Sequence, residues 1–273
     1  MVDRPIFDHV AIAVHRWSDG FDLLVHELGG VWGRGGDAGE FAPGQLSYEH
    51  DMKVELLEPG RSGVKGFVDR FLERQGPGAH HLTFKVPDIE RFNRGCESHG
   101  FEVMPGSLEL ADRQETFVHP RQTGWGTLLQ AIQDDGTYDA VTPRPEGFPE
   151  ATAPQHALVW VAVVIPDVSD ALSLLTRVLD GTVIALDLGP AGGWALVEWS
   201  PARRLLLTTT GALASMRGHA GAVGVDHVLF GRPGTPPPDP AGWLARPLPP
   251  VLPLLGVPIA QMDAGGEPDR VLR

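Results

Sequence analysis

The sequence predicts an α+β protein built from tandem copies of one unit, in which a strand is followed by a helix and then by three further strands. Three observations predict this fold. Short apolar strands begin at His9 and again at His81. Each strand is followed by an amphipathic segment and then by residues suited to a hairpin. A third strand of the same kind begins at Trp160, which indicates an internal duplication.

The first unit starts with residues 9–14, which are apolar and β-branched enough for a buried strand. Ser18 is a suitable N-cap for the helix that follows, and Gly29 stops that helix. The apolar face of the helix consists of Phe21, Leu24, Val25 and Leu28. Residues 45–49 and 53–57 then read as two strands joined by a short polar turn, which predicts a hairpin.

The second unit repeats this order. Residues 81–86 form a strand, and residues 89–99 form a helix that Gly100 ends. Residues 116–119 and 127–132 then supply a second hairpin. Two consecutive units of the same kind predict a domain with pseudo-twofold symmetry.

A linker follows the second unit, because residues 134–155 are rich in Asp, Gly, Thr and Pro and show little periodicity. We therefore predict a metal-binding domain at residues 1–135, a linker at 136–156 and a second domain at 157–273.

The second domain reads as a degenerate copy of the first. Two positions follow their counterparts at the same offset of 151 residues: Trp160 follows His9, and Leu206 follows Glu55. His227 stands where His81 stood. The copy therefore offers Trp, Leu and His in place of His, Glu and His, and its polar site is predicted to be lost. Residues 231–253 are dense in proline, so we expect an extended loop in place of the last helix, with a proline-rich ligand for another domain as the alternative.

Four strands of the first domain each offer one polar side chain suited to a metal ion. These side chains are His9, Glu55, His81 and Gln130. Because alternate residues of a strand face the same side of a sheet, one inward side chain from each strand can converge on an ion without a dedicated loop.

Composition excludes some classes of function. The formal net charge of −13 and the lack of a Lys/Arg cluster argue against nucleic acid as the main partner. Cys96 is the single cysteine, so an intrachain disulfide is excluded and a reducing, cytoplasmic location is expected. The N-terminus has no signal-peptide pattern, and no segment approaches the roughly 20 apolar residues of a membrane span.

Several short motifs, standing in family order, resemble the vicinal oxygen chelate superfamily, which includes glyoxalase I, extradiol dioxygenases and bleomycin-resistance proteins. The local likeness is closest to methylmalonyl-CoA epimerases and spans roughly residues 5–133. The motifs are residues 8–14, 55–59, the helix at 67–74 running into 78–81, 86–89, 118–120 and 126–129. The resemblance implies two domains of paired βαβββ modules with cupped mixed sheets.

The resemblance also implies a divalent ion, Co, Ni, Mn, Fe or Zn, held by His9, Glu55, His81 and Gln130. Such an ion leaves coordination positions for substrate oxygens and stabilises an enolate. Related enzymes carry Glu at the position of Gln130, and an amide has no titratable proton to move. The family's other carboxylate comes from the strand at residues 45–50, which makes Glu49 the candidate base.

The expected function is that of a metal-dependent isomerase, epimerase or lyase acting on a small carbonyl, carboxylate or thioester substrate through a metal-stabilised enolate. Two alternatives stay open: a non-catalytic binding protein for an antibiotic or metabolite, and an Fe(II)-dependent ring-cleaving dioxygenase. The expected partner is a small molecule, and a homodimer is compatible with the sequence. Other polar side chains are expected to be structural. By strand alternation His80 should point away from His81, the alternative being that it is a ligand itself. Arg113 is expected to be a solvated surface arginine, the alternative being that it meets an anionic substrate.

Overall fold

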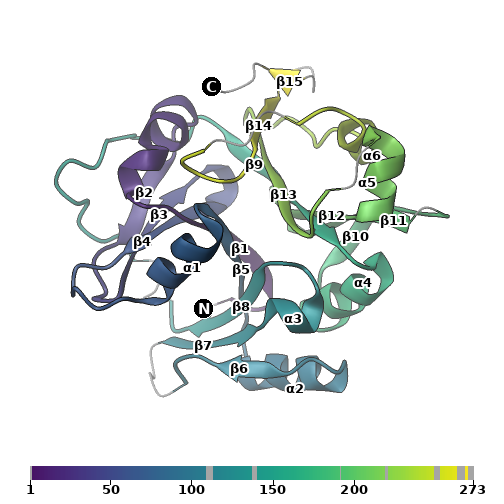
Figure 1. The fold of residues 1–273 in the computed structure, drawn as a ribbon, viewed down its shortest axis with the longest axis horizontal. Helices are drawn as coiled ribbons and strands as arrows, with labels where there is room; N and C mark the ends of the chain where they lie inside the picture. The colour runs from purple at the N-terminus through teal and green to yellow at the C-terminus, as the bar shows by residue number, and fades with distance from the viewer. Residues whose placement is uncertain are drawn as a thin grey trace.

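The computed structural model describes residues 2–108, 113–136, 140–190, 192–218, 221–248, 253–262 and 268–269. Its elements form two mixed sheets, which lie side by side in Figure 1. The first half of the chain, purple to teal in the figure, builds an eight-stranded sheet, and the second half, green to yellow, builds a seven-stranded sheet. The predicted fold class is therefore confirmed.

In the first half the elements are β1 (Ile6–Ala13), η1 (Trp17–Gly20), η2 (Phe21–Glu27), β2 (Val31–Gly35), β3 (Phe41–Ser47), η3 (Glu49–Asp51), β4 (Lys53–Pro59), α1 (Phe67–Gln75), β5 (Gly78–Lys85), α2 (Ile89–Ser98), β6 (Val103–Pro105), β7 (Arg113–Val118), α3 (Pro120–Thr123) and β8 (Leu128–Asp134). In the second half they are β9 (Ala157–Ile165), α4 (Val168–Arg177), β10 (Thr182–Gly189), β11 (Gly192–Ser200), β12 (Arg203–Thr209), α5 (Thr210–Arg217), β13 (Gly224–Gly231), α6 (Pro240–Leu244), β14 (Ile259–Met262) and β15 (Pro268–Asp269).

Strand order shows the repeated unit directly. The first sheet runs β2-β3-β4-β1-β5-β8-β7-β6, so the two units meet at the antiparallel pair β1 and β5. Within each unit the first strand lies parallel to the last, β1 beside β4 and β5 beside β8. The second sheet runs β10-β11-β12-β9-β13-β14-β15 and has the same centre, with β9 parallel to β12 and antiparallel to β13.

The first helix differs from the prediction. A 3₁₀ turn, η1, begins at Trp17 and continues as the π-helical segment η2, and Ser18 does not cap it. Instead, the Asp19 carboxylate accepts a hydrogen bond of 3.0 Å from the backbone N–H of Arg16. Strand β2 was not predicted, because two glycines interrupt its apolar pattern.

One hydrophobic core joins the two halves. Phe7 on β1 and Phe84 on β5 pack together at 5.2 Å between ring centroids, and Trp199 on β11 lies 5.0 Å from the ring of Phe84. All three side chains are buried. The sheets are therefore packed against each other through large aromatic side chains at the centre of the molecule.

The predicted linker also packs on the first half. The ring of Phe148 lies 4.6 Å from those of Phe21 and Trp32, and the Trp32 indole N–H donates to the carbonyl oxygen of Thr142 at 3.0 Å. The predicted domain boundaries stay a prediction.

Among the described residues, no helix has the length and apolar character needed to cross a membrane.

Candidate metal centre

The two central strands of the first sheet are irregular at the residue before each histidine. The β1–β5 register shifts between Phe7 and His9, and again between Ala11, which pairs with His81, and Ile12, which pairs with Ala79. Asp8 and His80 are therefore bulge residues, each the extra residue of a β-bulge. Such a residue does not follow the simple alternation of side chains along a strand.

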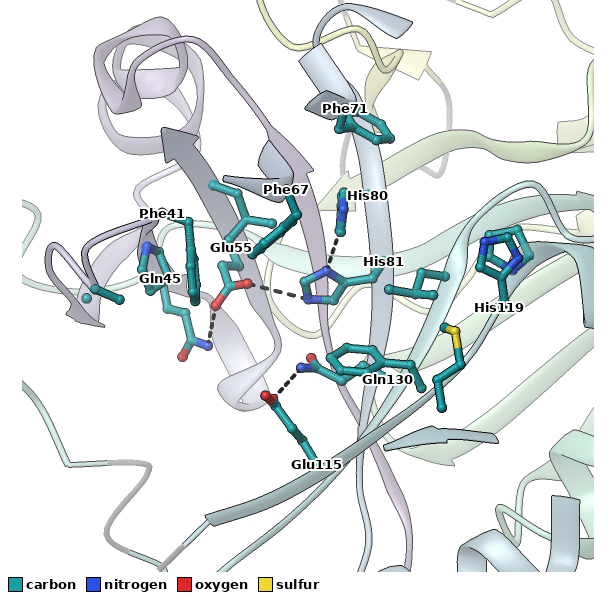
Figure 2. A pocket seen from close by; sticks show the side chains of 18 of the residues that line it. Phe41, Gln45, Glu55, Phe67, Phe71, His80, His81, Glu115, His119 and Gln130 are labelled. Atoms are coloured by element: carbon teal, nitrogen blue, oxygen red, sulfur yellow. Dashed lines mark hydrogen bonds and ion pairs between the residues drawn. The ribbon is translucent and has the colours of Figure 1, made fainter. Parts of the chain in front are cut away.

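In both bulges the extra residue contacts the imidazole that follows it. A carboxylate oxygen of Asp8 lies 2.8 Å from Nδ1 of His9, and Nδ1 of His80 lies 2.9 Å from Nδ1 of His81. The prediction that His80 points away from His81 is wrong, because the bulge breaks the alternation on which it rested. Figure 2 shows the His80 ring directed at His81.

With Nδ1 engaged, each imidazole directs Nε2 toward Glu55 on β4. Oε2 of Glu55 lies 3.7 Å from Nε2 of His9 and 3.5 Å from Nε2 of His81. Both Nε2 atoms are buried and make no hydrogen bond within the part of the chain that the structure describes. Buried polar atoms left in this way need a partner.

The spacing of these atoms fits a shared ion. The candidate ligand atoms of His9, Glu55 and His81 all lie within 4.8 Å of one another. Two ligands that are each about 2.1 Å from one ion lie roughly 3–4 Å apart, so an ion between the two imidazoles and the carboxylate would satisfy both orphaned nitrogens. These are three of the four residues that the sequence singled out, and they are suitable ligands for a divalent transition metal.

Register explains why these side chains meet. Ala11 on β1 pairs with Glu55 on one side and with His81 on the other. His9 is two residues before Ala11 and therefore shares its face of the sheet. Ala11 carries only a methyl group, which leaves space between the larger polar side chains.

The charges of the three groups are coupled. Burial alone would raise the pKa of the Glu55 carboxyl, but attraction to the His9 and His81 imidazoles outweighs it and holds that pKa well below its usual value. Burial opposes protonation of His9, yet Glu55 and Asp8 raise its pKa. For His81, burial dominates and lowers the pKa despite Glu55. Burial also lowers the pKa of the neighbouring His80, to about 3.

The predicted fourth ligand, Gln130, lies in the same cavity. Its carbonyl oxygen accepts a 2.7 Å hydrogen bond from the Thr83 hydroxyl, and its amide nitrogen donates to Oε2 of Glu115 at 2.9 Å. A carbonyl oxygen has a second lone pair, so the first of these bonds leaves it one electron pair for an ion. Coordination by Gln130 therefore remains a prediction.

Sequence reasoning missed Glu115. This residue lies on β7 in the cavity, where it also accepts a 2.7 Å bond from the Arg113 guanidinium. Arg113 is thus not a solvated surface arginine, because it lines the cavity beside Glu115. Arg113, Glu115 and Phe117 are alternate residues of the strand beside Gln130, so they share one face of the sheet, and this pattern can be seen in the sequence. Whether that face is the one with Gln130 depends on the β7–β8 register.

The structure does not bring Glu49 to the site. Strand β3 ends at Ser47, and Glu49 lies in the 3₁₀ turn η3, away from the cavity lining. Because the turn begins at Glu49 and not after it, Glu49 does not continue the strand alternation on which the predicted shared face with Glu55 depended. From the same strand it is Gln45 that faces the site, donating to Oε1 of Glu55 at 3.0 Å.

The cavity has a volume of about 760 Å³, and much of its wall is aromatic. The half-buried rings that line it, together called the aromatic wall, are Phe41, Phe67, Phe71 and Phe117. Figure 2 shows Glu55, His81 and Gln130 near one another, with the labelled rings of Phe41, Phe67 and Phe71 on one side of them. His80 packs against the wall, 5.3 Å from Phe67 and 5.0 Å from Phe71 between ring centroids.

The fold and the site together define a candidate metal centre at the middle of a sheet made of two βαβββ units. Residues 8–117 match the family model described as the Glyoxalase/Bleomycin resistance protein/Dioxygenase superfamily. The N-terminal half of the chain is therefore similar to this superfamily, the vicinal oxygen chelate proteins, which agrees with the resemblance that the motifs carry. No curated protein sequence matches the chain.

Among solved structures, the chain is similar to a variant of 4-hydroxymandelate synthase from Streptomyces coelicolor, with 15% identity and a TM-score of 0.56 over 84% of this chain and 71% of that one. It is also similar to methylmalonyl-CoA epimerase from Mycobacterium tuberculosis, with 19% identity and a TM-score of 0.42 over 50% of this chain and 95% of that one. The first similarity covers both halves and supports the shared fold.

Proposed function

We propose that this protein is a divalent-metal-dependent isomerase, epimerase or lyase that acts on a small carbonyl, carboxylate or thioester substrate. The observation that carries the proposal is the pair of buried, orphaned imidazole Nε2 atoms on either side of the Glu55 carboxylate. His9, Glu55 and His81 would hold the ion, with Gln130 as a fourth ligand. A bound divalent ion would polarise a substrate carbonyl and make a neighbouring C–H bond more acidic.

Proton transfer needs a group that titrates, and two polar side chains in this cavity are amides. Gln45 and Gln130 have no proton to exchange near neutral pH. Glu115 is the carboxylate next to Gln130, and we assign to it the proton-moving role that the sequence gave to Glu49. The Arg113 guanidinium at 2.7 Å and the Gln130 amide hold the Glu115 carboxylate in place.

The aromatic wall favours a substrate with an apolar body. A ligand that covers half-buried phenyl rings removes apolar surface from water. This stabilises the complex by roughly 25 cal/mol for each Å² of apolar surface buried. Oxygen atoms of such a substrate would face the metal ligands, and its apolar part would contact the wall.

A binding protein without catalysis is the second candidate. It is favoured by the two amides, Gln45 and Gln130, at positions close to Glu55 and Glu115. A protein of this kind would retain the cavity and the ion but would not exchange substrate protons.

Metal content is the first test. The chain is purified without chelators or a histidine tag, and bound metals are measured by elemental mass spectrometry. We expect near-stoichiometric Co, Ni, Mn, Fe or Zn, lost in the His9→Ala/His81→Ala double variant and retained in His227→Ala, the matched histidine of the second half. No metal in the unmodified chain, even after reconstitution, would remove the basis of this mechanism.

Proton transfer is tested separately from metal binding. The metal-loaded protein is incubated in D₂O with methylmalonyl-CoA, phenylpyruvate or pyruvate, and deuterium at the carbon next to the carbonyl is followed by NMR. For a substrate that exchanges, Glu115→Gln should slow exchange by about 100-fold or more while metal content is unchanged. Unaltered exchange in Glu115→Gln would exclude Glu115 as the base, and no exchange with any metal-loaded sample would favour the binding protein.

A further inference from the structure

An arginine of the second half reaches the strand that carries His9. Arg203, at the start of β12, is only 7% exposed. One guanidinium nitrogen donates to the backbone carbonyl of Phe7 at 2.8 Å and lies 3.9 Å from Oδ1 of Asp8. The other donates to the carbonyl oxygen of Asp51 at 3.0 Å. The contacts of this guanidinium therefore cross from one half of the chain to the other.

Its neighbour Asp8 connects this contact to the metal centre. Asp8 is fully buried, and its Oδ2 is the atom that engages Nδ1 of His9 at 2.8 Å. Its Oδ1 accepts a 3.0 Å bond from the ammonium group of Lys53. A buried carboxylate held between two cations and an imidazole has little freedom to rotate.

The Asp8–His9 contact decides which imidazole nitrogen is available to an ion. A carboxylate at Nδ1 keeps the proton there, so the lone pair of Nε2 faces Glu55. Arg203 also fixes the Phe7 carbonyl, which is the peptide group directly before the bulge that places Asp8. Both contacts of Arg203 thus act on the orientation of His9.

We propose that Arg203 is a positioning residue of the metal centre, through which the second half of the chain holds His9 ready to bind the ion. This inference rests on the proposed metal site. The second half would then support metal binding by the first half, although it contributes no ligand of its own.

The next residue supplies a matched control. Arg204 is also mostly buried and also on β12, but its guanidinium contacts Glu198 at 2.6 Å and the Val159 carbonyl at 3.5 Å, both within the second half. Replacing Arg204 therefore removes an arginine from the same strand without touching Asp8 or Phe7.

The test measures Co²⁺ affinity, by competition with a chromophoric chelator, and the visible absorption spectrum of the Co²⁺ protein. Arg203→Met should weaken Co²⁺ binding by about 10- to 100-fold and alter the spectrum, as loss of a group behind a metal ligand does. Arg204→Met should change neither quantity. Denaturant unfolding of each metal-free variant shows that the measurements are made on folded protein.

Arg203→Lys provides a second variant if Arg203→Met does not fold. A lysine keeps the charge but cannot donate to both carbonyl groups in the same fork geometry, so its Co²⁺ affinity should lie between those of the unmodified chain and Arg203→Met.

Three results overturn the inference: Co²⁺ affinity in Arg203→Met equal to that of the unmodified chain, equal losses in Arg203→Met and Arg204→Met, or an unchanged affinity in Arg203→Lys when Arg203→Met is unfolded. If the unmodified chain itself binds no Co²⁺, the metal site of the proposed function fails as well. If it binds Co²⁺ and Arg203→Met binds equally well, only the role of Arg203 fails.

Discussion

The two halves of the chain share the pairing of their central strands but differ in the side chains that these strands bring together. In the first, Ala11 pairs with Glu55 and His81; in the second, Ala162 pairs with Leu206 and His227. The bulge before the histidine is also repeated, because the β13 register shifts between Val225 and His227. Its extra residue, Asp226, contacts Nδ1 of His227 at 2.8 Å, as Asp8 does for His9. The second half therefore keeps the device that orients an imidazole.

What differs is the partner of Nε2. His227 Nε2 accepts hydrogen bonds from the indole N–H groups of Trp160, at 3.1 Å, and Trp243, at 3.0 Å. Trp160 stands at the position of His9, and Trp243 comes from α6, the short helix of the proline-rich segment. The comparison teaches that an oriented buried histidine is not sufficient for a metal site. The neighbouring side chains decide whether its free nitrogen faces a carboxylate or is satisfied by the core.

Glu55→Leu gives the first half the residue that the second half carries at this position. It removes the negative ligand, and the charge interaction lost is several kcal/mol, so metal affinity should fall on the order of 1000-fold or more. Equilibrium dialysis against a metal buffer measures the loss. Retained tight binding would show that the carboxylate is not a ligand.

Trp243→Ala opens the interior of the second half. Removal of a buried tryptophan should lower the free energy of unfolding by about 3–5 kcal/mol, and it leaves His227 with one indole donor. Urea unfolding of the metal-free protein is the measurement. Metal content should be unaffected. A loss of metal in a folded variant would show that the candidate metal site of the first half depends on the core around His227.

His80→Ala removes the group behind His81 and leaves every proposed ligand in place. We expect metal affinity to fall by about 10-fold, because the partner of Nδ1 sets the orientation of the ring. His119→Ala, at another point of the cavity lining, is the control. Equal affinities of the two variants would contradict a supporting role for His80.

The pH dependence of stability sharpens the comparison for His227. Burial lowers its pKa below the ordinary value of 6.5, although Asp226 opposes this. As the pH falls through 6.5, the unfolded chain takes up a proton that the folded His227 does not, so stability decreases by at most about 1.4 kcal/mol per pH unit. Urea unfolding of metal-free protein at pH 7 and pH 5 should show a smaller decrease in His227→Asn than in the unmodified chain.

Much of this arrangement was predictable because it depends on strand order and alternation. The offset of 151 residues places Leu206 opposite Ala162 as Glu55 lies opposite Ala11, and His9, Glu55 and His81 meet as the motifs indicated. The errors fall where the backbone departs from regular geometry. His80 was misplaced because of a bulge, and Glu49 was misplaced because the turn after β3 begins at Glu49 itself.

Glu115 was missed for another reason. The face of the sheet on which Glu115 lies depends on the register between β7 and β8. The residues between those strands contain a short helix, α3, which no periodic pattern in the sequence predicts. Trp243 was hidden in the same way, because a five-residue helix after a run of prolines carries too little pattern to place one side chain.

The shared aromatic core has a consequence for protein engineering. A fragment that ended at residue 135 would keep every candidate ligand, yet it would expose the faces of Phe7 and Phe84 that Trp199 covers and would leave Asp8 without the nearby guanidinium of Arg203. We therefore expect such a fragment to be less stable than the full chain. Selection on the candidate metal site would then also preserve the second half, and a transfer of the site to another scaffold would require both halves.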